Sequence, residues 1–205
     1  LYIAQKSGHK FLAIYADVKP ARAAVIVVHG LGVHPDWALN GALRSGLADQ
    51  GYATLSLQMP VLAADGLREE YSALFPDAAD RLRAAVAFLT ANGHRNIAIA
   101  CHSVGSRMCN FFLVSAPDPG VAAWISIGMV PSEFAEPAKL HLPILDIYGE
   151  RDFAQVLQSA GTRAAILKTL KGSAQIEVAG ADHYFAGSEI ELVKLARQFL
   201  DRQFK

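Results

Sequence analysis

The sequence IAIACHSVG at residues 97–105 joins a short apolar run to the start of a helical pattern. Residues 97–100 are apolar throughout, which predicts a short buried strand, and residues 104–114 are predicted to form a helix. Ser103 stands between them, where the chain must turn sharply. A bare Ser-x-Gly arises by chance in many proteins. Ser103 is therefore either a functional residue exposed at this turn or an ordinary helix N-cap. The rest of the chain decides between the two.

The alternation of strand and helix extends in both directions from this stretch. Alternating elements of this kind predict right-handed crossovers and a mainly parallel sheet with helices on both faces. In such sheets the functional site lies at the carboxyl ends of the strands, so the residues that follow each strand are the informative ones. Strands are predicted at residues 11–16, 24–28, 52–57, 123–129, 144–148 and 175–178, and further helices at residues 37–50, 77–90, 153–169 and 188–204.

Length and composition indicate one soluble α/β domain spanning residues 1–205, because no repeat or polar linker divides the 205 residues. A hydrophobic fraction of 52% against 19% charged residues excludes intrinsic disorder. Lys+Arg and Asp+Glu both number 19, so nothing favours a nucleic-acid partner. The apolar runs are shorter than the roughly 18 residues of a membrane span. Compartment and oligomeric state stay open.

The chain has two cysteines, too few for a disulfide framework. Cys101 is expected at the end of a strand and Cys109 two turns into the following helix. That placement predicts a Cα separation too large for a disulfide, and therefore two free, buried thiols.

Three residues with complementary chemistry follow three different predicted strands. Ser103 follows the strand at residues 97–100, Asp152 follows the strand at residues 144–148, and His183 follows the strand at residues 175–178. A hydroxyl, a histidine and a carboxylate can together form a nucleophile, its general base and the group that orients the base.

The order serine, acid, histidine resembles the α/β-hydrolase superfamily, from residue 11 to the last helix. The motif that carries the resemblance is x-His-Ser-x-Gly at residues 101–105, in which Cys101 replaces the more usual glycine. The chain also resembles small bacterial members of unassigned function, through residues 30–37 and 54–60. The resemblance implies a strained nucleophile elbow at Ser103, with His183 as the base and Asp152 as its partner.

The stretch His29-Gly30-Leu31-Gly32 resembles the family's oxyanion loop. The backbone N–H of Leu31 would then pair with that of Val104 to stabilise a tetrahedral oxyanion. A dinucleotide-binding fingerprint would need a glycine where Pro35 stands, so no cofactor is expected. No set of residues with metal-ligand spacing is apparent either.

Several residues near these motifs are candidates for lining a substrate cleft: Gly30, Trp37 and His102. Trp37 is either a wall of the acyl pocket or a packing residue at a helix start. His102 is common beside the serine without being catalytic. Residues 59–75, polar in the middle, form either a flap over the site or a plain surface loop.

Three further acids have structural interpretations. Glu150 is expected in a surface salt bridge, and Asp182 is expected to organise the loop that holds His183. Asp146 lies inside an apolar strand, where a hydrogen-bonded structural side chain is favoured over a catalytic one.

The segment between Met129 and Pro143 has room for one short helical piece, around residues 132–139. Large members of the family that the chain resembles insert a helical lid at this point, so the resemblance implies an α/β-hydrolase fold with a minimal cap or none.

These features favour a serine hydrolase that cleaves a carboxylic ester or thioester of a small acyl substrate. The alternative is a binding or accessory protein on a hydrolase scaffold that has lost catalysis, since fold alone does not determine function. An acyltransferase or a peptidase would use the same residues.

Overall fold

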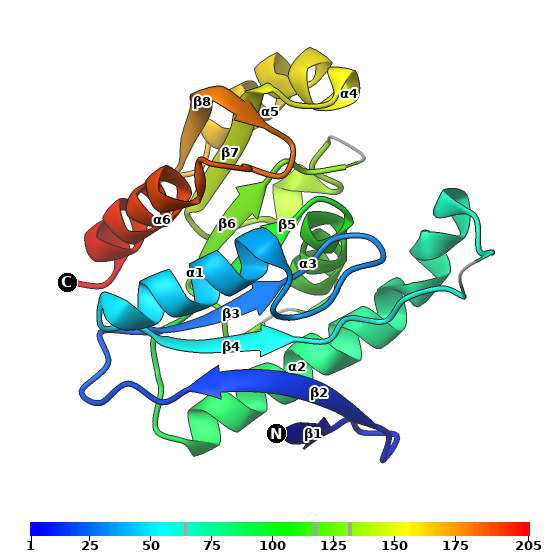
Figure 1. Ribbon diagram of the computed structural model, residues 1–205, viewed down its shortest axis with the longest axis vertical. Coiled ribbons are helices and arrows are strands. Elements are labelled where there is room, and N and C mark those ends of the chain that lie inside the picture. Colours follow the sequence, from blue (N-terminus) through cyan, green and yellow to red (C-terminus); the bar gives the residue numbers. More distant parts are fainter. Residues whose placement is uncertain (64, 117–118, 131–132) are drawn as a thin grey trace.

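The computed structural model describes residues 1–63, 65–116, 119–130 and 133–205. Within these ranges a central sheet has the strand order β1-β2-β4-β3-β5-β6-β7-β8 (Figure 1). Strands β3 to β8 run parallel, whereas β1 and β2 are antiparallel and form one edge. The mainly parallel sheet is therefore confirmed. The strands are β1 (Tyr2–Ala4), β2 (Lys10–Ala16), β3 (Ala24–Val28), β4 (Ala53–Leu57), β5 (Ile97–His102), β6 (Ala123–Ile127), β7 (Ile144–Arg151) and β8 (Ala174–Asp182).

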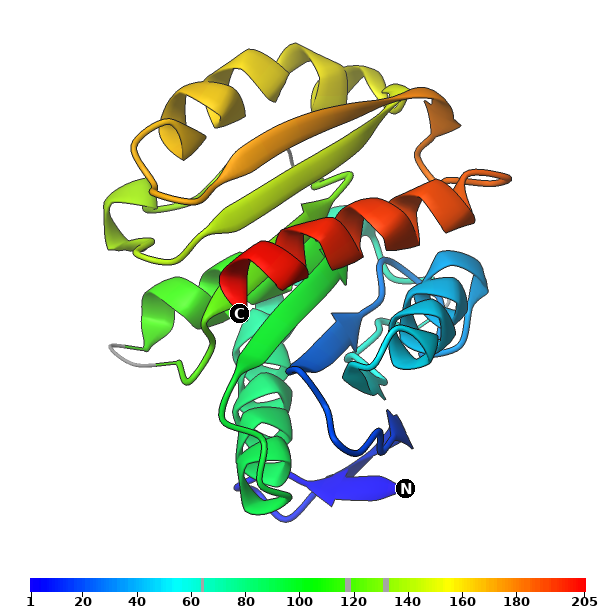
Figure 2. The ribbon, with the colours of Figure 1, turned by 90° about the vertical axis from the view of Figure 1, so that its left-hand side faces the viewer.

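Helices cover both faces of the sheet, so each face has its own hydrophobic core. Helices α1 and α6 pack on one face, and α2 and α3 on the other (Figures 1 and 2). No helix in the described ranges is long and apolar enough to cross a membrane. The helices are α1 (Ala38–Asp49), α2 (Phe75–Ala91), α3 (Val104–Ser115), α4 (Ala154–Gln158), α5 (Ala160–Leu167) and α6 (Glu189–Gln203), with 3₁₀ turns η1 (Arg68–Leu74) and η2 (Pro137–Lys139).

The central strand β5 shows how the sequence builds both layers. Ile97 and Ile99 enter the core under α2 and α3, whereas Ala98 and Ala100 enter the core under α1 and α6. Successive side chains of a strand point to opposite faces, so a strand buried on both sides is apolar throughout.

The helix predicted over residues 153–169 is broken into α4 and α5 at Ser159. The carbonyl oxygen of Val156 accepts a hydrogen bond of 3.0 Å from Nη1 of Arg163. A continuous helix would use that carbonyl for the amide of Ala160. The break in the helix thus coincides with the hydrogen bond between Arg163 and Val156. The spacing of apolar residues in the sequence does not reveal such a contact.

Two short elements were not predicted from the sequence. Strand β1 pairs with β2 at the sheet edge, and η1 lies within residues 59–75 and runs directly into α2. Because η1 joins α2, that helix begins at Phe75 rather than at Asp77.

The segment between β6 and β7 holds only η2 among its described residues. The short helical piece predicted for residues 132–139 is therefore reduced to a single 3₁₀ turn, and Ser132 lies outside the described residues. No helical lid is formed by the described part of this segment.

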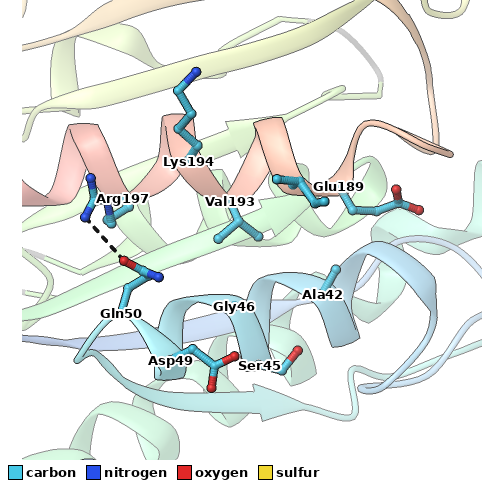
Figure 3. A pocket seen from close by; sticks show the side chains of 10 residues that line it. Ala42, Ser45, Gly46, Asp49, Gln50, Glu189, Val193, Lys194 and Arg197 are labelled. Atoms are coloured by element: carbon cyan, nitrogen blue, oxygen red, sulfur yellow. Dashed lines mark hydrogen bonds between the residues drawn. The ribbon is translucent and has the colours of Figure 1, made fainter.

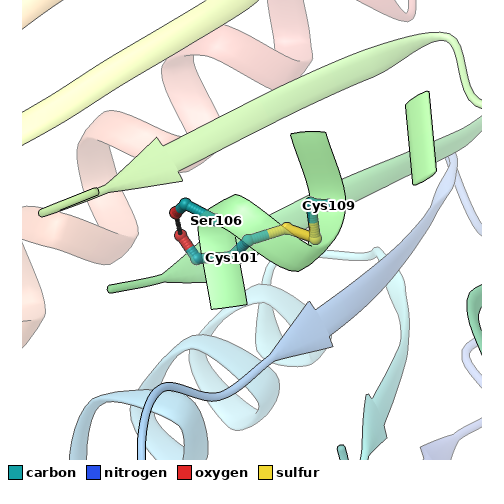
Figure 4. Close-up of a disulfide and its surroundings, with 3 residues drawn as sticks. All are labelled: Cys101, Ser106 and Cys109. Carbon is teal, nitrogen blue, oxygen red and sulfur yellow. Dashed lines mark hydrogen bonds between the residues drawn. A yellow bond between two sulfur atoms is a disulfide. The ribbon is translucent and has the colours of Figure 1, made fainter. Parts of the chain in front are cut away.

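The two cysteines form a disulfide, so the prediction of free thiols was wrong (Figure 4). The Cα atoms of Cys101 and Cys109 are 6.8 Å apart, within the range that a disulfide spans. Cys101 belongs to the core under α2 and α3 and so faces the helix that carries Cys109. The sharp turn after β5 brings α3 back alongside β5. The Cα atoms of Cys101 and Cys109 are therefore closer together than their sequence separation suggested.

Candidate active site

The turn between β5 and α3 places Ser103 in a conformation that L-residues rarely adopt, with φ 55° and ψ −125°. Its backbone N–H donates to the carbonyl of Ile127 at 2.8 Å, which ties the turn to β6. Gly105 is required for the approach of α3, because a Cβ at this position would overlap the carbonyl oxygen of His29. The result is a strand–turn–helix that presents a single hydroxyl at the carboxyl edge of the sheet.

Ser103 occupies the N-cap position of α3, but its side chain makes no capping hydrogen bond. Its Oγ lies 3.0 Å from Nε2 of His183, and Nδ1 of His183 lies 2.6 Å from Oδ1 of Asp152. All three side chains are buried. Residues from the ends of β5, β7 and β8 thus form one continuous chain of hydrogen bonds.

Backbone groups hold the carboxylate of Asp152 in place. Its Oδ1 accepts from the N–H of Phe153 at 2.7 Å, and its Oδ2 accepts from that of Gly149 at 3.3 Å. Gly128, at φ 50°, leaves room beside the pair, since a Cβ there would lie 3.1 Å from Nδ1 of His183. Asp152 and His183 are therefore fixed relative to each other by the main chain around them.

Asp182 organises the loop that carries His183, as predicted from the sequence. Oδ1 of Asp182 accepts hydrogen bonds from the backbone of Tyr184 at 2.9 Å and of Ala186 at 3.2 Å. Glu150 is exposed as predicted, but its partner is the N–H of Gly180 at 2.7 Å and not a basic side chain. These contacts close the end of β8 against the end of β7.

Asp146 is completely buried within β7 and is structural, as favoured from the sequence. Its Oδ2 accepts from Nε of Arg163 at 2.8 Å and from the side-chain amide of Gln175 at 2.9 Å. This buried ion pair anchors α5 to the sheet beside the strand that leads to Asp152.

His29 has a role that the sequence analysis missed. The N–H of Met59 donates to its Nε2 at 2.9 Å, so Nδ1 carries the proton and donates to the carbonyl oxygen of Gly30 at 2.7 Å. Burial lowers the pKa of His29 to about 4, which keeps the ring neutral. The carbonyl and N–H of a trans peptide point in opposite directions, so this bond also orients the N–H of Leu31. The sequence feature that could have revealed this role is the position of His29 directly after the buried strand β3.

His102 is buried against the loop of His183. Its Nε2 donates to the carbonyl oxygen of His183 at 2.9 Å, and burial lowers its pKa to about 4. The neutral ring of His102 thus supports the loop that carries His183. It forms no hydrogen bond with the hydroxyl of Ser103 among the described residues.

A small cavity of about 70 Å³ opens over Ser103 and His183. The three cleft candidates, Gly30, Trp37 and His102, all line it. Trp37 also occupies the N-cap position of α1, so it belongs to the helix start as well as to the cavity wall.

Two aromatic side chains at this cavity were not identified from the sequence. Phe153 stacks on the ring of His183 with centroids 4.0 Å apart, and Tyr184 meets Trp37 edge to face at 5.7 Å. Together with Trp37 they surround the histidine with apolar surface.

A separate groove of about 520 Å³ runs between α1 and α6 (Figure 3). Gly46 faces Val193 across it, and Arg197 donates to the side chain of Gln50 at 3.3 Å. None of the predicted site residues lines this groove. Among the described residues there is also no cluster of three His, Cys, Asp or Glu side chains that would hold a metal ion.

Comparison with known proteins identifies the fold. Over residues 3–79 the chain matches a family described as "Protein of unknown function (DUF3530)". No curated protein matches it. A dienelactone hydrolase from Anabaena variabilis has a similar structure, with 20% identity, a TM-score of 0.78 and coverage of 100% of this chain and 97% of that one.

Two further solved structures are similar over almost the same length. A serine hydrolase without a lid from Xanthomonas campestris is 18% identical, with a TM-score of 0.78 and coverage of 100% of this chain and 94% of the other. An esterase from Pyrococcus furiosus is 14% identical, with a TM-score of 0.82 and coverage of 100% and 90%.

Proposed function

Because this chain has the α/β-hydrolase fold, we propose that it is a serine hydrolase that cleaves a carboxylic ester or thioester through an acyl-enzyme. The observation that carries the proposal is the hydrogen-bonded chain from Ser103 through His183 to Asp152. Each member follows a different strand, at the sheet edge where folds of this class bind their substrates.

In the first half of the reaction Oγ of Ser103 forms a bond to the substrate carbonyl carbon while its proton passes to Nε2 of His183. The tetrahedral intermediate then collapses, the bond to the alcohol or thiol breaks, and His183 returns the proton to that leaving group. In the second half water attacks the acyl-enzyme, with His183 again accepting and returning the proton. The net reaction consumes one water molecule.

Asp152 orients the imidazole rather than taking its proton. Its hydrogen bond to Nδ1 keeps Nε2 free to accept from Ser103 and stabilises the imidazolium that forms. Phe153 stacks face to face on the imidazole of His183 and so helps to hold the orientation of that ring.

The oxyanion is assigned to the backbone N–H groups of Leu31 and Val104. Neither donates to an acceptor among the described residues. Val104 is the first residue of α3, where the helix dipole favours negative charge. In other hydrolases such a donor is worth about 3 kcal/mol in the transition state.

The comparisons support the same general chemistry. The three similar structures are those of a dienelactone hydrolase, an esterase and a serine hydrolase without a lid. The described part of the β6–β7 connection likewise forms no lid, which suits a small acyl substrate that enters from solvent.

The experiment that tests the proposal combines turnover with covalent labelling. The wild-type protein should hydrolyse p-nitrophenyl butyrate and should be modified at Ser103 by a fluorophosphonate, as located by mass spectrometry. Ser103→Ala should remain folded and lose both properties. A folded wild-type protein that neither turns over esters nor labels at Ser103 would overturn the proposal and favour the binding or accessory role.

A further inference from the structure

A second cavity, of about 300 Å³, adjoins the turn that carries Ser103. Val104 and Val130 line it, and the N–H of Val130 contacts the carbonyl oxygen of Ser103 at 3.4 Å. The opposite wall comes from η1 and the start of α2, through Tyr71 and Phe75. The cavity thus begins at Val104, the residue that follows the proposed nucleophile, on the face of the sheet that α2 and α3 cover.

The positively charged side chain of Arg107 also lines the cavity. Arg107 lies one helical turn beyond Val104, on the same side of α3. Its Nε is buried and has no hydrogen-bond acceptor among the described residues. Within the described ranges its side chain makes one long hydrogen bond of 3.4 Å, from Nη1 to the carbonyl oxygen of Glu133. The fully buried Arg163, by contrast, is bound by the carboxylate of Asp146.

The buried Nε donor of Arg107 costs free energy while it has no acceptor, and a carboxylate ligand would supply one. Two carboxylates lie near Arg107: Glu69 lines the same cavity from an exposed position, and Glu133 is beside it. Neither forms an ion pair with Arg107 within the described part of the chain. The planar fork of the guanidinium matches a carboxylate.

The position of His183 decides which part of a substrate enters this cavity. His183 must protonate the leaving group, and it lines the small aromatic cavity but not the cavity of Arg107. The leaving group is therefore expected among Trp37, Phe153 and Tyr184. The acyl group must extend the other way, past Val104 and toward Arg107.

We propose that Arg107 binds a carboxylate on the acyl part of the substrate, so that the preferred substrates are half-esters or half-thioesters of short dicarboxylic acids. This inference rests on the proposed function. It assigns the carboxylate to the guanidinium of Arg107, with the side chains of Ser72 and Gln155 as further polar groups of the same cavity.

The kinetic test compares two esters of the same chain length, p-nitrophenyl hemiglutarate and p-nitrophenyl valerate. The wild-type protein should prefer the anionic ester in kcat/KM. In Arg107→Met the ratio of the two kcat/KM values should fall about 10-fold to 100-fold, as expected for loss of a charge-assisted hydrogen bond. Arg107→Lys should retain part of the preference. Arg202→Met, which removes an exposed arginine at the end of α6, is the matched control and should leave the ratio unchanged.

A binding measurement separates this inference from the proposed reaction. Glutarate should bind to the folded Ser103→Ala variant in calorimetric titration, and the affinity should fall at least 10-fold when Arg107→Met is added. Binding without any ester hydrolysis by the wild-type protein would support the Arg107 site and overturn only the proposed reaction. Hydrolysis with a ratio that Arg107→Met does not change, or glutarate binding that does not depend on Arg107, would overturn the inference.

Discussion

Nδ1 of His29 donates a hydrogen bond of 2.7 Å to the carbonyl oxygen of Gly30, within the loop proposed to hold the oxyanion. The ring is held from its other side by the N–H of Met59. His29 therefore connects β3 and the segment after β4 to the peptide that carries the N–H of Leu31. It acts as a positioning residue, since it touches the loop and not the reacting atoms.

Replacing His29 by Ala should release the Gly30–Leu31 peptide and lower kcat for p-nitrophenyl butyrate by about 100-fold, with a smaller change in KM. His29→Asn retains a donor near the position of Nδ1 and should recover part of kcat. His9→Ala, at an exposed histidine, is the control and should behave as wild type. If His29→Asn loses as much kcat and as much thermal stability as His29→Ala, the role of His29 is purely structural.

The two buried histidines predict that stability decreases in weak acid. Burial lowers the pKa of His29 and of His102 to about 4, from 6.5 in the unfolded chain. Between these values the unfolded state binds more protons than the folded state, so stability present above pH 6.5 is lost as the pH falls toward 4.

At pH 5 the expected loss is about 2 kcal/mol for each histidine, relative to pH 7.5. Urea unfolding at the two pH values measures it. His102→Gln should reduce the pH dependence by about half, whatever its effect on absolute stability. A free energy of unfolding that is the same at both pH values would contradict the assignment of two neutral buried rings.

Much of the site was predictable because strand ends are visible in the sequence. The five apolar residues of β3 predicted that strand with its observed bounds, and the positions of Ser103, Asp152 and His183 after their strands follow from the same pattern. The disulfide was not predictable, since the distance from Cys101 to Cys109 depends on the direction in which α3 leaves the turn. The free donor of Arg107 likewise depends on which side chains surround it in space.

The buried pair of Asp146 and Arg163 predicts a large loss of stability when the acid is removed. Asp146→Ala takes away the carboxylate that neutralises a fully buried guanidinium, and such changes cost about 3–5 kcal/mol. Chemical unfolding measures the difference. The control is Glu191→Ala, which removes the exposed pair with Lys194 and should cost less than about 1 kcal/mol. Similar costs for both variants would contradict the buried geometry of the Asp146 pair.

The disulfide between Cys101 and Cys109 joins the end of β5 to the second turn of α3, on either side of Ser103. Closing a loop with a sequence separation of 8 stabilises the folded protein by about 2.5 kcal/mol in the chain-entropy description. Reduction with a phosphine should therefore lower Tm by about 5–10 °C. It should also slow fluorophosphonate labelling of Ser103, because the turn loses its covalent anchor.

The control for reduction is the double variant Cys101→Ser and Cys109→Ser, whose Tm and labelling rate should not respond to the reductant. A thiol assay before and after reduction should count zero and two free thiols in the wild-type protein. Two free thiols before reduction would contradict the disulfide itself. Two thiols after reduction with no change in Tm or labelling would show that the cross-link does not hold the turn.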